Sequence, residues 1–113
     1  MASLEHISSV DDFKAACAKH RVLIIDAFAD WCGPCKQIAP VFEALAAAAP
    51  PGVGFYKMDV DAAQELASLL NVSSLPTFLL IVGGQVRDTV IGANRSKLEA
   101  LVKAAFTSSA PPA

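Results

Sequence analysis

Two cysteines separated by two residues form the most reactive pattern in this 113-residue sequence. Cys32 and Cys35 enclose Gly33 and Pro34, and proline is favoured at the first position of a helix. Residues three apart on a helix share a face, which places the two Cα atoms about 5–6 Å apart, the usual range for a disulfide. The spacing therefore predicts a dithiol that can close into a Cys32–Cys35 disulfide with little backbone movement.

The two thiols are expected to differ in reactivity. Cys32, at the amino end of the predicted helix, meets unpaired backbone N–H groups and the positive end of the helix dipole, which both favour the thiolate. Cys35 lies one turn further in and should be more buried and less acidic. We therefore expect Cys32 to attack a substrate disulfide and Cys35 to resolve the mixed disulfide that results.

A zinc site, a permanent structural disulfide and an inert buried pair are the alternative interpretations of the two cysteines. A zinc site would need Cys17 and His20 as its other half, but a strand over 22–29 would separate the two pairs by roughly 25 Å. So small a loop disfavours a permanent structural disulfide, and a helix start at Pro34 disfavours an inert buried pair. We therefore predict no metal site and interpret Cys17 as a core thiol.

The elements that must position the pair alternate along the chain. Extended segments are predicted at 4–7, 22–29, 53–60, 77–82 and 85–91. Helices are predicted after Ser9, from about Pro34 to Ala49, from Asp61 to about Leu70, and from Ser96, the last two from capping-box patterns with Gln64 and Glu99. The continuous apolar run 22–29 indicates a strand covered on both faces, and Gly83-Gly84 indicates a hairpin. This order predicts an α/β fold with a mixed sheet.

Composition limits the class of protein. Hydrophobic residues make up 54% and charged residues 18%, and the net charge is −2, which disfavours disorder and provides no broad basic field for nucleic acid. No apolar run reaches the ~18 residues of a membrane span, and residues 1–10 lack the pattern of a signal peptide. We therefore expect one domain over residues 1–106, a mobile tail over 107–113, and a cytoplasmic monomer that binds neither nucleic acid nor membrane.

With the strand, the motif and the helix in place, the sequence resembles the thioredoxin family of small protein-disulfide reductases. The resemblance runs through nearly all of residues 4–106, and it is carried by residues 26–36 (DAFADWCGPCK), Pro40, 60–61 (VD), 75–78 (LPTF), Gly84 and Gly92. It implies a thioredoxin fold, with three α/β/α layers, a central mixed five-stranded sheet in the order 1-3-2-4-5, and four flanking helices. It also implies a general reductase of client proteins that binds no cofactor and takes electrons from NADPH through thioredoxin reductase.

The resemblance gives roles to residues around the cysteines. Asp26 interrupts an apolar strand, so burial should raise its pKa, and the matching aspartate in the family assists proton transfer for the resolving cysteine, here Cys35. Lys57 resembles the family lysine that partners this aspartate, although an edge-strand lysine that faces water is an alternative. Gly33 and Pro34 are expected to favour reducing over oxidising behaviour.

A docking surface is also implied by the resemblance. Pro76 is expected to form a cis bond with Leu75, whose backbone would pair with an extended substrate strand. Five further residues would complete a mostly apolar surface: Trp31, Gly33, Pro34, Gly92 and Ala93. Phe28 stands where tryptophan is usual in the family, and Leu75 replaces the more frequent isoleucine or methionine.

Two other functions are open on the sequence alone. One is a binding module with this fold whose redox activity is incidental. The other is an oxidase or isomerase of secreted disulfides, which the Gly33-Pro34 pair and the missing signal sequence disfavour.

Overall fold

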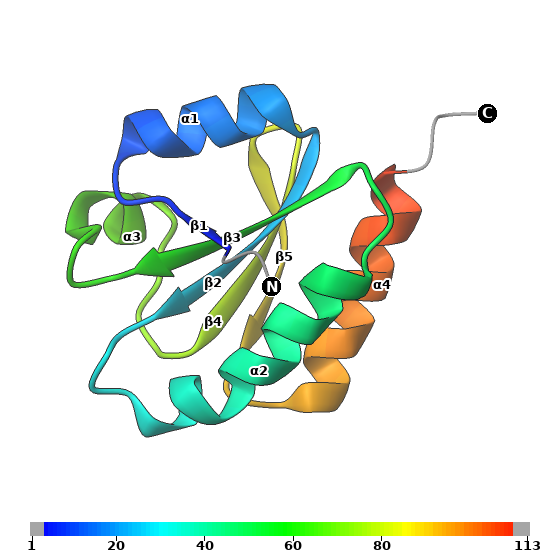
Figure 1. Cartoon of the computed structure of the whole chain (residues 1–113). Coiled ribbons are helices and arrows are strands. Elements are labelled where there is room, and N and C mark those ends of the chain that lie inside the picture. The colour runs from blue at the N-terminus through cyan, green and yellow to red at the C-terminus, as the bar shows by residue number, and fades with distance from the viewer. Residues whose placement is uncertain (1–3, 110–113) are drawn as a thin grey trace.

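Five strands form the central sheet of the computed structural model, which describes residues 4–109 (Figure 1). The strands are β1 (Glu5–His6), β2 (Val22–Phe28), β3 (Val53–Asp59), β4 (Thr77–Val82) and β5 (Gln85–Ile91). Their order in the sheet is β1-β3-β2-β4-β5. The first three are parallel, whereas β4 runs antiparallel to β2 and β5 antiparallel to β4. The predicted mixed sheet and its order are confirmed.

Two layers of helices cover the sheet. Helices α1 (Val10–Lys19) and α3 (Gln64–Leu69) lie on one face, and α2 (Gly33–Ala48) and α4 (Arg95–Ser109) lie on the other (Figure 1). Strand β2 supplies both cores, because Leu23 and Ile25 pack in the cluster of α1 and α3 while Val22 and Ile24 pack in that of α2 and α4. The apolar run in β2 is therefore buried on both faces, as its sequence predicts.

The start of α3 differs from the sequence prediction. Asp61 and Gln64 do not form a capping box, because the N-cap residue is Ala63 and no side chain caps the helix. The helix ends at Leu69, and Asn71 adopts a left-handed conformation with φ of 60°. Bonds from the N–H groups of Asn71 and Val72 to carbonyls of the last turn close the helix in a Schellman motif.

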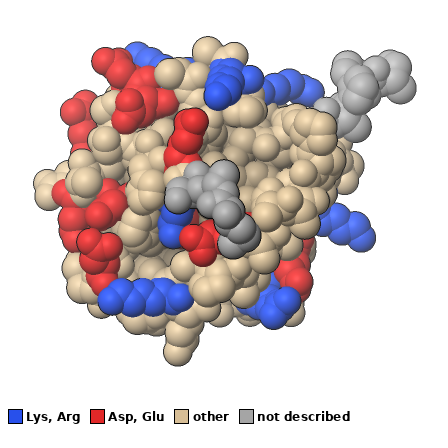
Figure 2. All heavy atoms as spheres, viewed as in Figure 1, with Lys and Arg blue, Asp and Glu red and all other residues tan. Residues whose placement is uncertain are grey.

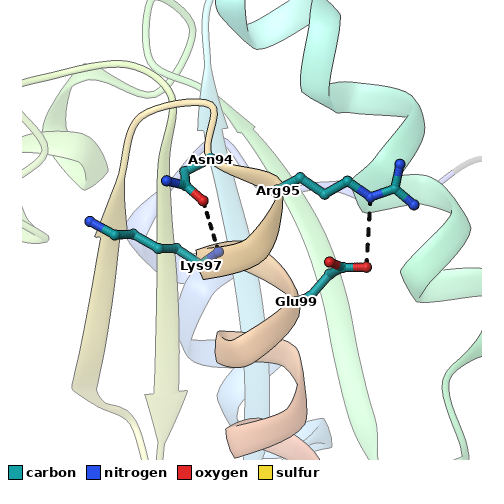
Figure 3. Close-up of polar contacts among 4 residues, drawn as sticks. All are labelled: Asn94, Arg95, Lys97 and Glu99. Carbon is teal, nitrogen blue, oxygen red and sulfur yellow. Dashed lines mark hydrogen bonds and ion pairs between the residues drawn. The ribbon is translucent and has the colours of Figure 1, made fainter.

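The start of α4 also differs from the prediction (Figure 3). Ser96 lies inside the helix, and Asn94 caps it instead, because Oδ1 of Asn94 accepts the backbone N–H of Lys97 at 3.0 Å. Glu99, expected to complete a capping box with Ser96, forms an ion pair with Arg95 at 3.6 Å. An asparagine two residues upstream of the serine provides the cap first, and the helix starts there.

The predicted tail over residues 107–113 overlaps the end of α4. Helix α4 continues to Ser109, and the hydroxyl of Thr107 donates to the carbonyl of Lys103 at 3.2 Å. A threonine can satisfy its hydroxyl in this way within a helix, so polar composition alone does not end one. The remainder of the predicted tail, residues 110–113, lies outside the described residues, as do residues 1–3.

The cap of α4 gives a stability prediction. Asn94→Ala removes the acceptor for the N–H of Lys97 and should lower the free energy of unfolding by about 1 kcal/mol. Ser96→Ala is the matched control, since it changes an exposed position inside the same turn and should cost less than about 0.5 kcal/mol. Urea denaturation of the oxidised protein measures both values. Equal losses for the two variants would contradict the assignment of the cap.

Candidate active site

The cysteine pair lies where β2 leads into α2. Cys32 and Cys35 form a disulfide with their Cα atoms 5.3 Å apart, within the range predicted from their spacing. Cys32 is the N-cap residue of α2, and its Sγ accepts the backbone N–H of Cys35 at 3.2 Å. Pro34 occupies the first turn, where its missing N–H costs no hydrogen bond.

The two sulfurs are not equally accessible. Cys32 is 6% exposed and Cys35 is 3% exposed. Of these two cysteines, Cys32 is among the described residues that line a cavity of about 520 Å³, and Cys35 is not. The cavity is lined by Trp31, Cys32, Gly33, Pro34, Val60, Val72, Ser73 and Leu75. A substrate disulfide can therefore approach Cys32, while Cys35 lies behind it in the first turn of the helix.

Three of the lining residues were not predicted from the sequence. Val60 follows β3, and Val72 and Ser73 follow α3, so the fold brings them to Cys32 from remote parts of the chain. Val60 could have been predicted from its position at the carboxyl end of a central strand, because α/β folds place sites at that edge of the sheet. Val72 and Ser73 carry no such signal.

Trp31 is fixed although it is 71% exposed. Its indole Nε1–H donates to Oδ2 of Asp61 at 2.8 Å, and the backbone N–H of Asp61 donates to Oδ1 of Asp59 at 3.0 Å. Asp61, for which the sequence predicts a helix cap, is therefore a contact of the site. The bond orients the indole beside the cavity that Trp31 lines.

The turn before β4 contains the expected cis bond between Leu75 and Pro76. The carbonyl of Pro76 accepts the N–H of Gly92 at 2.8 Å, and Gly92 has φ of 99°, a conformation that favours glycine. This bond joins the end of β5 to the turn beside the cysteines. Leu75 lines the cavity, whereas Pro76, Gly92 and the exposed Ala93 are not among its lining residues in the described chain.

Asp26 is 1% exposed on β2, between Lys57 on β3 and Phe78 on β4. Burial raises the pKa of its carboxyl from 3.8 to about 7; attraction to Lys57 lowers it, and repulsion from Glu43 raises it. The predicted burial of Asp26 is confirmed. Its carboxyl projects from the sheet face that α2 covers, because it alternates along β2 with residues of the other face.

Lys57 lies on an interior strand, since β3 pairs with both β1 and β2. The alternative of an edge-strand lysine therefore does not hold. Lys57 is half-buried, it is the register partner of Asp26, and its Nζ is 4.8 Å from the centroid of the Phe28 ring. Its ammonium thus acts on Asp26 while it contacts an aromatic face.

The zinc alternative finds no support in the structure. Cys17 packs, half-buried, against the core of α1 and α3, and burial raises the pKa of its thiol. His20 meets the ring of Tyr56 edge-on, with centroids 5.9 Å apart. Among residues 4–109, no three His, Cys, Asp or Glu side chains gather in a way that could hold a metal ion.

Charges are unevenly distributed on the face shown in Figure 2. Acidic side chains gather on the side where α3 and the ends of β2 and β3 lie, whereas basic side chains are scattered, most of them along the outline and one near the middle of the view. This face therefore has no continuous basic surface. None of the helices within the described part of the chain is long and apolar enough to cross a bilayer.

Comparisons with known proteins agree with this geometry. The family model for thioredoxin matches residues 5–104. A thioredoxin of Malassezia sympodialis is 47% identical over 98 residues, which cover 85% of this chain and 92% of that protein. Thioredoxin-1 of Schizosaccharomyces pombe is 38% identical over 101 residues, covering 89% of this chain and 97% of that protein. The chain belongs to the thioredoxin family.

Solved structures of family members superpose closely on this chain. The crystal structure of Malassezia sympodialis thioredoxin has a TM-score of 0.84 at 43% identity, covering 93% of this chain and 92% of that one. The structure of Fasciola hepatica thioredoxin has a TM-score of 0.85 at 36% identity, covering 90% and 99%. Thioredoxins are protein-disulfide oxidoreductases that need no bound cofactor. The chain is therefore a protein-disulfide reductase, and Cys32 and Cys35 are its redox pair.

The burial of Asp26 gives a prediction for the pH dependence of stability. Because the folded state raises the pKa of this acid from 3.8 to about 7, the folded state binds the proton more tightly than the unfolded state. The wild-type protein should therefore lose stability as the pH rises from about 4 to about 7, by up to about 1.4 kcal/mol per pH unit. Asp26→Asn removes the titrating carboxyl. The free energy of unfolding of the variant should therefore increase relative to that of the wild type over that pH range.

Urea denaturation of the oxidised protein at a series of pH values measures the slope. Asp88→Asn is the matched control, because Asp88 is exposed on β5 and asparagine keeps an oxygen to accept the N–H of Thr89. The control should retain the wild-type slope. Parallel curves for Asp26→Asn and the wild type would show that the carboxyl is not buried in solution.

Proposed function

We propose that Cys32 attacks client disulfides as a thiolate and that Cys35 resolves the mixed disulfide. The observation that carries this division of roles is the position of Cys32, which caps α2 and lines the cavity while Cys35 lies behind it. The N–H groups at the helix start and the helix dipole favour negative charge on the capping sulfur.

The reaction balances as a transfer of two electrons. The Cys32 thiolate bonds to one sulfur of the client disulfide, the client S–S bond breaks, and the other client sulfur leaves as a thiolate that takes up a proton. Cys35 then loses its proton and attacks Sγ of Cys32. The Cys32–Cys35 disulfide forms, and the second client sulfur is released and protonated.

We assign the proton transfer for Cys35 to Asp26. A carboxyl with a pKa of about 7 can accept and return a proton near neutral pH, and Asp26 projects from the sheet face that α2 covers. Lys57 and Glu43 adjust its affinity for the proton in opposite directions. Gly33 and Pro34 act on the redox potential because they form the loop between the two sulfurs.

Clients bind, in this proposal, along the turn before β4. The backbone of Leu75 pairs with an extended client segment beside the cis bond to Pro76. Trp31, held by Asp61, contributes an apolar wall of the cavity, and Gly92 and Ala93 continue the surface from the end of β5. Backbone pairing with few charged contacts suits many clients.

The remaining parts of the cycle follow from family membership. We propose that thioredoxin reductase returns the disulfide to the dithiol with electrons from NADPH, and that the protein works as a monomer in the cytoplasm. Disulfide-containing client proteins are the class of substrate that the family implies.

Cysteine variants test the two roles. With NADPH, thioredoxin reductase and a disulfide-bonded protein, the wild type should support NADPH oxidation, and Cys32→Ser and Cys35→Ser should both abolish it. Cys35→Ser should also accumulate a covalent complex with the client on non-reducing gels, because the attack occurs and the resolution does not. Cys17→Ser, the control, should behave as the wild type. NADPH oxidation that persists in Cys32→Ser would overturn the proposal.

A variant of the turn tests client docking. Pro76→Ala should lower the rate of client reduction severalfold while both cysteines remain titratable by a thiol reagent, because the turn that presents the Leu75 backbone is altered. Pro51→Ala, in the exposed turn after α2, is the control and should leave the rate unchanged. Equal rates for Pro76→Ala and the wild type would remove this turn from the docking surface.

A further inference from the structure

The ring of Phe28 contacts two side chains that come from other strands. Nζ of Lys57 is 4.8 Å from the ring centroid, and the ring of His6 meets it edge-on, with centroids 5.8 Å apart and planes at 81°. An ammonium within about 6 Å of an aromatic face is attracted by the negative charge of that face. Phe28 therefore holds the Lys57 ammonium, and His6 on β1 packs against the same ring.

Asp26 is the other group that could hold this ammonium. Lys57 is in register with Asp26 on β2 and with His6 on β1, so the three side chains project from one face of the sheet. Phe28 follows Asp26 by two residues on β2 and projects from that face as well. The Lys57 side chain therefore leaves the sheet close to both the Asp26 carboxyl and the Phe28 ring.

The ammonium contacts the ring and not the carboxyl. Within residues 4–109 the one ion pair joins Arg95 to Glu99, so Lys57 and Asp26 are not paired directly. Direct contact with a carboxyl that is 1% exposed would favour the ionised form strongly, because little water screens the attraction. The place where the ring holds the ammonium therefore determines how strongly Lys57 acts on Asp26.

We propose that Phe28 is a positioning residue for Asp26: its ring keeps the Lys57 ammonium out of ion-pair contact and thereby controls when the buried carboxyl releases its proton. The importance of this control for catalysis rests on the proposed role of Asp26 in proton transfer. The control itself does not, since it concerns only the electrostatic surroundings of the carboxyl.

Among the described residues, Lys57 is the cation that acts on the Asp26 carboxyl. Burial raises the pKa of Asp26, Lys57 counteracts this, and Glu43 on α2 adds to it. Phe78, the neighbour on β4, is apolar, and Cys35 on α2 is in the disulfide. His6 contacts the ring of Phe28. A movement of the Lys57 ammonium is therefore the change to which Asp26 should respond most.

The experiment follows the carboxyl carbon of Asp26 by NMR during a pH titration of the oxidised 113-residue chain. Phe28→Leu keeps an apolar side chain but removes the aromatic face, so the ammonium can move to the carboxylate. The titration midpoint should fall by about one pH unit, the lower end of the effect of a close opposite charge. Phe28→Trp restores an aromatic face and should keep the midpoint close to that of the wild type.

Removal of the ring could also admit water, which would lower the midpoint without any part for Lys57. The same substitution is therefore repeated in a Lys57→Met background, where Phe28→Leu should no longer move the midpoint. An equal fall in both backgrounds, or no fall in either, would overturn the proposal. Client reduction by Asp26→Asn is measured separately: an unchanged rate would overturn the role of Asp26 in proton transfer and leave the titration result standing.

Discussion

The start of α2 depends on the sulfur that also carries the chemistry. Sγ of Cys32 accepts the N–H of Cys35, so the residue that caps the helix is the one proposed to attack the client disulfide. The same N–H group and the helix dipole favour a negative charge on this sulfur once the disulfide is reduced. Both redox states can therefore share one backbone. The place of this helix start is fixed in turn by β2, whose residues pack into both cores of the protein.

The cavity beside Cys32 is assembled from segments that are remote in the sequence. The start of α2, the residue after β3, and the turn between α3 and β4 each contribute part of its lining. Two hydrogen bonds join these segments to their neighbours: Trp31 to Asp61, and Gly92 to Pro76. A mixed sheet thus carries a site made largely of loops, which is where α/β folds place theirs.

Features determined by local sequence could be predicted, and features determined by competition or distance could not. The cysteine spacing and the apolar run of β2 are each compatible with one favourable local structure. The sequence therefore predicts the disulfide geometry and a strand buried on both faces. The predicted cap residues of α3 and α4 were wrong because of competing partners. The carboxylate of Asp61 accepts the indole N–H of Trp31, and Asn94, two residues before Ser96, caps α4. No local pattern marks Val72 as a wall of the site.

Asp26 shows that stability and the proposed proton transfer make opposite demands on one position. An apolar residue between Lys57 and Phe78 would cost nothing to bury, whereas a carboxyl there loses its hydration and holds its proton more tightly. Full pairing with Lys57 would recover part of that cost, but it would also fix the carboxyl in its ionised form. The ring of Phe28 holds the ammonium at an intermediate place. With a pKa of about 7, the acid lies close to the balance between its two protonation states near neutral pH.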